Sequence, residues 1–183
     1  DEEALSVREA ELSMLQRLGA PEQNILVALG NLATTYETQG RLEQALRLRR
    51  DVYSGFLKLF GEENIHTILN ANNYVLSLVN LQRFEEAKAL QRKTLPVTRR
   101  VCGENHEVTL KARLVYGETL YRDPSATLDD LREAVETIED TARTARRVLG
   151  GSHPLTEGVE YEVPDARAAL AAREGTPPGN ARP

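Results

Sequence analysis

Residues 40–45 read GRLEQA, and the pattern recurs 42 residues later as QRFEEA at residues 82–87. A second stretch keeps the same interval, because LFGEEN at residues 59–64 recurs as VCGENH at residues 101–106. A third copy contains LREA at residues 131–134, which lies 47 residues after its counterpart in the second copy. A fixed interval of this length is typical of chains built from stacked supersecondary units.

The five additional residues of the third copy fall in a turn-forming cluster, RDPSAT at residues 122–127. Such clusters of Asp, Pro and Ser usually connect periodic segments. The N-terminal residues resemble the second half of one more copy. The predicted organisation is a partial repeat at residues 1–20, followed by full repeats at 22–61, 64–103 and 106–150.

Each copy contains two segments in which apolar residues recur at intervals of three and four, the periodicity of a helix. The first segment of the first full copy shows it at Leu26, Leu29, Leu32, Ala33 and Tyr36. Its second segment continues the same spacing from Leu42 to Phe60. We therefore predict an antiparallel helix pair per copy, which buries its apolar face only by stacking on its neighbours.

The predicted helices carry stop and start signals at matching positions. A glycine follows the last apolar residue of each second helix, where left-handed backbone is common; these glycines are Gly61, Gly103 and Gly150. The next helices begin near three aligned residues, Asn64, His106 and His153.

The C-terminal residues depart from the repeat. Residues 154–173 are predicted to form a capping helix, which Pro164 would kink or split because proline lacks an amide hydrogen. Residues 174–183 are rich in Gly and Pro and are predicted to be a flexible tail. A single domain would then span residues 1–173.

The copies resemble tetratricopeptide repeats, on the evidence of the 40–45 turn and of small residues at Ala33, Ala45 and Ala87. The 42-residue interval and a Gly-x-x-Asn/His-x-x-Thr connector resemble the kinesin-light-chain subtype. The connector threonines are Thr67, Thr109 and Thr156. The resemblance implies an all-α fold, a right-handed superhelix (solenoid) of antiparallel helix pairs. Arg49 and Gln91 replace the aromatic residue that is usual four positions after the turn alanine.

Composition excludes several classes of function. The formal net charge is -5, which excludes a globally basic nucleic-acid binder, and aromatic residues make up only 5%, too few for base stacking. No apolar run approaches the length of a membrane-spanning helix. Cys102 is the single cysteine, so an intramolecular disulfide is excluded. We expect a soluble, cytoplasmic protein without a cofactor, and nothing in the sequence supports a homo-oligomer.

Catalytic and metal-binding constellations are not apparent. The histidines His66, His106 and His153 lie in connectors, where turn or capping roles are favoured over metal ligation. Cys102 occupies an apolar position and is predicted to be a packed thiol. The acidic pair Asp129-Asp130 is adjacent in sequence and so diverges around a helix. We therefore predict neither an enzyme nor a metal site.

Arginine and lysine residues cluster on the second helices of the copies. The first cluster comprises Arg47, Arg49 and Arg50. We favour exposed side chains that pair with nearby acids, namely Glu43, Asp51, Glu136 and Glu139. Attraction of an acidic partner or a membrane surface is the alternative.

The resemblance also implies that the first helices line a concave groove that binds a peptide. The residues at groove positions are Asn31, Thr34, Leu69, Asn72, Asn73, Leu76, Asn80, Lys111, Leu114 and Arg122. Asparagine is a poor helix former, but its amide both donates and accepts hydrogen bonds and so suits a peptide backbone. The alternative interpretation is that these amides bridge neighbouring helices.

Two functional hypotheses follow. The first is a protein-interaction module or adaptor that binds an extended or short helical peptide segment of another protein in its groove. The second is a structural subunit of a larger assembly, docked through the convex face or the open end of the solenoid.

Overall fold

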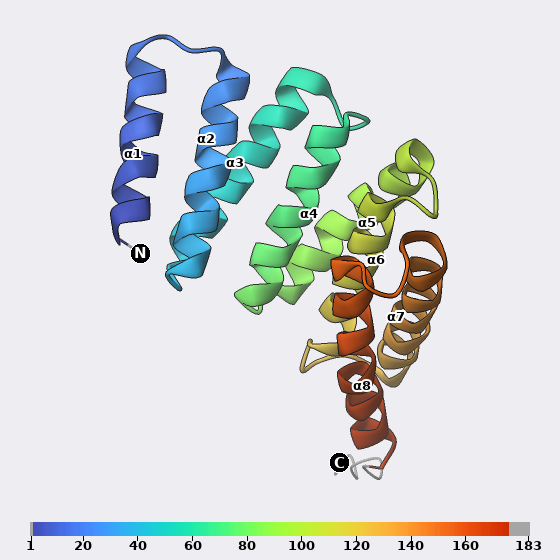
Figure 1. Ribbon diagram of the computed structural model, residues 1–183. Helices are drawn as coiled ribbons and strands as arrows, with labels where there is room; N and C mark the ends of the chain where they lie inside the picture. Colours follow the sequence, from blue (N-terminus) through green and yellow to red (C-terminus); the bar gives the residue numbers. More distant parts are fainter. Residues whose placement is uncertain (1, 176–183) are drawn as a thin grey trace. The chain divides into compact units, whose positions relative to one another are not determined.

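The computed structural model describes residues 2–175 (Figure 1). These residues form eight helices, joined by short connectors, and no strand. They are α1 (Glu2–Arg17), α2 (Glu22–Thr38), α3 (Leu42–Phe60), α4 (Ile65–Asn80), α5 (Phe84–Cys102), α6 (Glu107–Tyr121), α7 (Leu128–Leu149) and α8 (Pro154–Glu174). The all-α fold of paired helices predicted from the repeat is confirmed. Of the predicted tail, residues 176–183 lie outside the described part.

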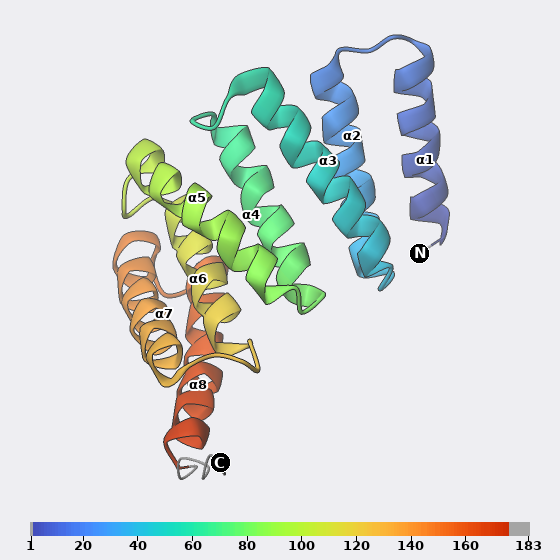
Figure 2. The ribbon, with the colours of Figure 1, turned by 180° about the vertical axis from the view of Figure 1, so that it is seen from behind.

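The chain divides into two compact units, Asp1–Val97 and Thr98–Pro183, with the boundary inside α5. In the first unit, α1 packs on α2, α2 on α3, and α3 on α4. Helices α2 and α4 face the viewer in Figure 1, whereas α3 and the first part of α5 face the viewer in Figure 2. First and second helices of the copies thus occupy opposite faces of this unit.

The interior of the first unit is built from the apolar positions that define the helical periodicity. Leu26 of α2 packs against Val52 and Phe56 of α3, and Leu29 covers this cluster. Gly55 permits the close approach of the two helices, because a Cβ there would lie 2.5 Å from the Leu26 side chain. This cluster therefore lies within the first full copy, and the packing of α3 on α4 joins that copy to the next one.

The predicted ends of the helices are confirmed. Gly61, Gly103 and Gly150 all have positive φ, at 79°, 86° and 92°. Asn64 Oδ1 accepts a hydrogen bond from the His66 amide at 2.8 Å. His106 Nδ1 accepts from the Val108 amide and His153 Nδ1 from the Leu155 amide, both at 3.2 Å. These bonds satisfy donors at the start of α4, α6 and α8.

The second unit contains α6, α7 and α8, and α8 packs on both of the other helices. Its core comprises Leu114, Ile138, Ala142, Val159 and Ala166. The insertion at residues 122–127 lies between α6 and α7 and ends in a capping box, in which Thr127 and Asp130 exchange hydrogen bonds. The extra residues thus lengthen a connection without disturbing the helix pair.

The prediction that Pro164 could split the last helix is wrong, because α8 runs unbroken from Pro154 to Glu174. Pro164 is exposed. The carbonyl four residues earlier, which loses its helical donor, can therefore be hydrated at the surface. Packing of Val159 and Ala166 on α6 and α7 holds the helix together on both sides of the proline.

Candidate protein-interaction site

The residues predicted to contact a peptide fall into two sets. Helices α2 and α4 of the first unit carry Asn31, Thr34, Leu69, Asn72, Asn73, Leu76 and Asn80. Lys111 and Leu114 lie on α6 of the second unit, and Arg122 is the residue that follows this helix. The structure therefore brings the first seven residues into one unit and leaves the other three in the second.

A polar network joins α2 and α4, the helices that carry the first set, to α3. Arg49 reaches from α3 to α2, where its Nε and Nη2 lie 3.1 and 2.6 Å from the two carboxylate oxygens of Glu37. Nη2 also donates to Thr34 Oγ1 at 3.0 Å, and Nη1 to the Gly30 carbonyl at 3.3 Å. Ser77 of α4 completes the network by donating to Glu37 Oε1 at 2.7 Å.

Glu37 stays ionised in this network. Burial alone would raise the pKa of its carboxyl group, but the hydrogen bonds from Arg49 and Ser77 outweigh burial and lower that pKa below its usual value. One carboxylate thereby links side chains from α3 and α4 to α2. The relative positions of these helices are fixed at the surface where a peptide is predicted to bind.

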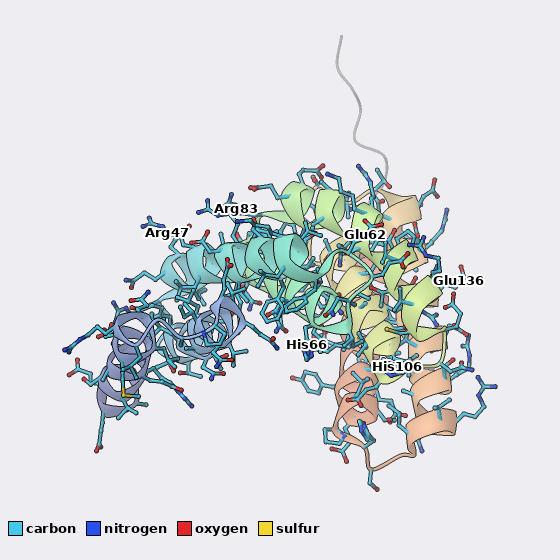
Figure 3. The ribbon with its side chains drawn as sticks, turned by 90° about the horizontal axis from the view of Figure 1, so that it is seen from above. Arg47, Glu62, His66, Arg83, His106 and Glu136 are labelled. Carbon is cyan, nitrogen blue, oxygen red and sulfur yellow. The ribbon has the colours of Figure 1, made fainter. Side chains whose placement is uncertain are left out.

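The prediction that Arg49 is an exposed surface charge is wrong, because it is buried and paired with Glu37. A guanidinium can be buried when its donors meet a carboxylate and further acceptors, as they do here. The pairing predicted for its neighbour Arg50 is present, with Asp51 at 3.1 Å. Figure 3 shows Arg47 and Arg83 projecting from the same edge of the first unit.

The asparagines of the first set differ in their surroundings. Asn31 and Asn80 are exposed, and Asn73 is half-buried. Within residues 2–175, the side-chain amides of these three residues form no hydrogen bond. Asn72, which was also expected at the surface, is only 6% exposed, and its Nδ2 has no partner in the described part of the chain.

The remaining apolar and polar positions of the first set are distributed similarly. Leu69 and Leu76 are half-buried on α4. Thr34 is exposed, but its hydroxyl already donates to the Gly30 carbonyl at 3.2 Å and accepts from Arg49. The surface of α2 and α4 therefore offers free amides next to partly exposed leucines.

The second set contains one core residue and two surface cations. Leu114 belongs to the core of the second unit, whereas Lys111 and Arg122 are exposed. Arg122 Nη1 lies 3.5 Å from Glu118 Oε2. Leu114 is therefore buried and does not lie on the surface where it was predicted.

Sequence reasoning missed a cluster of acidic groups between α6 and α8. Burial and the nearby carboxylate of Glu162 raise the pKa of Glu118 to about 7, although Arg122 opposes the change. The Tyr121 hydroxyl donates to Glu162, and burial together with this bond raises the pKa of the phenol. Glu162 lies on a helix outside the repeats, so no sequence periodicity connects it with Glu118.

The described residues offer little basis for a metal site, a reactive thiol or a membrane span. Among residues 2–175, no group of three or more His, Cys, Asp or Glu side chains could hold a metal ion. Burial raises the pKa of the Cys102 thiol, which keeps it protonated. None of the helices formed by these residues is both long and apolar enough to cross a membrane.

Comparison with known proteins identifies the type of repeat. A family model for the tetratricopeptide repeat matches residues 25–66 and 71–107. No curated protein matches the sequence significantly.

Solved structures share the fold at low sequence identity. The nearly identical TPR-like repeats of a kinesin light chain from Podospora anserina superpose with a TM-score of 0.73 at 18% identity, over 94% of this chain and 80% of that chain. A single-substitution variant of the same protein gives a TM-score of 0.75 over the same shares at 18% identity. BtubC (BKLC) from P. vanneervenii gives 0.63 at 18% identity, over 100% of this chain and 78% of that one.

Tetratricopeptide repeats are in general non-catalytic scaffolds that mediate contacts between proteins, and their stacked helices expose extended binding surfaces. The repeat interval, the helix pairs, the family model and the structural neighbours agree. Residues 25–66 and 71–107 match the tetratricopeptide repeat, and the chain shares its fold with the kinesin-light-chain-like repeats of these solved structures.

Proposed function

We propose that the chain binds an extended peptide segment of another protein across α2 and α4 of the first unit. The observation that carries this proposal is the set of three side-chain amides, on Asn31, Asn73 and Asn80, that form no hydrogen bond within residues 2–175. Each amide can donate to a peptide carbonyl and accept from a peptide N–H.

The repeat register supports a shared role for two of these residues. Asn31 and Asn73 are separated by the repeat interval of 42 residues and so occupy equivalent positions on neighbouring first helices. A peptide that crosses α2 and α4 could therefore meet two amides in succession. Leu69 and Leu76 would contact apolar side chains of that peptide, and the Arg49–Glu37–Ser77 network would keep the surface preorganised.

The second unit is considered by itself, and there Lys111 and Arg122 are exposed cations that would attract an acidic peptide stretch. Because charges at the surface are screened by salt, affinity should then decrease as ionic strength increases.

A second candidate function, that of a structural subunit in a larger assembly, is favoured by the outer surface of α1. Two apolar side chains of α1 are strongly exposed, Val7 at 60% and Met14 at 56%, and so is Leu18 directly after the helix, at 74%. An exposed apolar stripe of this kind is typical of a docking surface. The two candidates place the partner on different helices and can therefore be separated.

The test begins with a selection of random displayed peptides on the wild-type chain, followed by affinity measurements on the variants. Asn31→Ala combined with Asn73→Ala should weaken binding about tenfold, because each lost hydrogen bond is worth about 0.5–1.5 kcal/mol. Thermal stability should hold, since alanine is the better helix former at surface positions. Asn24→Ala, on the exposed first turn of α2, is the matched control and should bind as wild type does.

Two outcomes would contradict the proposal. Unchanged binding by the double variant would place the peptide elsewhere. A double variant that unfolds at the temperature of the assay would identify the amides as structural bridges. Val7→Ser together with Met14→Ser tests the second candidate, which predicts that these changes weaken capture of the partner and that the asparagine variants do not.

A further inference from the structure

A pocket of about 350 Å³ lies between α3, α4 and the first part of α5, within the first unit. Its apolar wall includes Leu57, Ile68, Ala71 and Leu90, and its polar lining includes Lys93 and Glu62. The volume falls in the range of about 300–1,000 Å³ that is usual for small-molecule sites. None of the three free asparagines lines it, so the pocket is separate from the proposed peptide surface.

At one position of the pocket lining, the second copy has a small residue where the other copies have large ones. By the repeat register, Ala71 corresponds to Leu29 in the first full copy and to Arg113 in the third. Leu29 packs against the core of the first unit, and Arg113 is buried in the second. Each of these side chains occupies volume that Ala71 leaves empty.

The charge at the position of Lys93, in the pocket lining, also differs between the copies. Lys93 corresponds to Asp51 in the first full copy and to Asp140 in the third. In the third copy, Arg113 Nη2 lies 2.5 Å from Asp140 Oδ2, so an aliphatic side chain with a cationic end pairs with the acid. In the second copy the helix supplies the cation instead, and Lys93 has no hydrogen bond or ion pair within residues 2–175.

We propose that this pocket binds an aliphatic carboxylate, with its chain against Leu57, Ile68 and Leu90 and its carboxylate at Lys93. The ligand would lie beside Ala71, at the position that the Arg113 side chain occupies in the third copy. The ligand would carry the negative charge and Lys93 the positive one, the reverse of the Arg113–Asp140 pair. Burial of methylene groups and a charge-assisted hydrogen bond supply the attraction.

The other polar residues of the lining determine how the ligand is oriented. Glu62 has an interaction partner of its own. Burial raises the pKa of the Tyr53 phenol, and the nearby charge of Glu62 raises it further. A second carboxylate next to Glu62 would be repelled. Lys93 is therefore the position of the ligand head group.

Octanoate titrated into the full 183-residue chain tests the proposal, with amide NMR spectra as the readout. We expect saturable shifts at Ala71 and Leu90 with a dissociation constant in the millimolar range, as befits so small a ligand. Octylammonium has the same chain and the opposite charge, and it should bind at least about tenfold more weakly.

Two variants copy what the other repeats contain. Lys93→Asp installs the residue of both other copies and should invert the preference, so that octylammonium binds and octanoate does not. Ala71→Leu installs the residue of the first full copy and should abolish binding of both probes while thermal stability holds.

Lys58→Asp is the matched control, because Lys58 is exposed on α3 and lies outside the pocket lining. It should change octanoate affinity by no more than about twofold, through long-range charge alone. Absent saturable shifts, or equal affinity of the wild type for the two probes, would overturn the proposal. Equal losses of octanoate affinity in Lys93→Asp and Lys58→Asp would also overturn it. Binding of octanoate by Ala71→Leu with wild-type affinity would do the same.

Discussion

At the scale of single residues, Arg49 shows how a buried charge can join helices that are distant in sequence. Its guanidinium is buried and donates to Glu37, Thr34 and the Gly30 carbonyl. Removing one partner of such a pair leaves the other desolvated and without compensation, which costs more than the pair contributes when intact. Arg49 and Glu37 should therefore be strongly coupled in stability.

Arg49→Ala is expected to lower the free energy of unfolding by about 2–3 kcal/mol, because the Glu37 carboxylate keeps only Ser77 as a donor. Chemical denaturation measures this loss. In the background of Glu37→Ala, the same substitution should cost at least about 1 kcal/mol less. Additive losses in the double variant would show that the network does not act as a unit.

Glu118 carries a pH dependence whose sign follows from its raised pKa. Its ordinary value is 4.5, and burial with the Glu162 charge raises the pKa to about 7 despite Arg122. The folded state therefore holds the proton more tightly. Its contribution to stability is complete below about pH 4.5 and is lost as the pH increases through about 7.

Glu118→Gln removes the ionisation, and its side chain is only 12% exposed in the wild type. Relative to the wild type, the variant should gain up to about 3 kcal/mol between about pH 4.5 and pH 8, the free energy that corresponds to the change in pKa. Denaturation at a series of pH values measures the gain. A difference between Glu118→Gln and wild type that stays constant over this pH range would contradict the prediction.

Residue roles were predictable from the sequence only where they depend on close neighbours in the chain. The capping roles of His106 and His153 could be predicted, because each bonds to an amide two residues later. The burial of Arg49 could not, since its partners lie on another helix and Ser77 lies on a third. The same is true of Asn72, whose burial depends on packing and not on helical spacing.

At the scale of elements, helix packing depends on small residues at the points of contact. Ala45 of α3 is 0% exposed. A carboxylate there would be buried without a partner, so Ala45→Asp is expected to lower the free energy of unfolding by more than about 3 kcal/mol. Ala89→Asp makes the same change at an exposed position of α5 and should cost less than about 1 kcal/mol. Equal effects would show that burial of Ala45 does not contribute to stability.

Apolar periodicity and the glycines that end the helices predicted the helices themselves. They did not predict that α8 continues through Pro164. A proline costs helix stability locally, and that cost predicts a break at Pro164. Contacts of Val159 and Ala166 with α6 and α7 compensate for it. Tertiary packing of this kind is not visible in the sequence of a single helix.

At the scale of the whole molecule, the 42-residue interval predicted stacked helix pairs, and differences between copies determine what each copy can do. Ala71, where the other copies have Leu29 and Arg113, lines a pocket between the first and second full copies, although the helices themselves keep the register. The sequence shows these differences as simple departures from the repeat. Their consequence becomes evident only when the residues that surround Ala71 are known.

The two terminal helices of the described chain should differ in local stability. α1 contains no buried residue and packs only on α2, whereas α8 buries Thr156, Val159 and Ala166 against two helices. Because the free energy of local opening follows the buried contacts that are lost, amides of α1 should exchange with solvent at least about tenfold faster than those of α8. Native-state hydrogen exchange on the 183-residue chain measures both helices together. Equal protection in the two helices would mean that α1 is covered by something else, and repeating the measurement over a range of protein concentrations would show whether a second copy provides that cover.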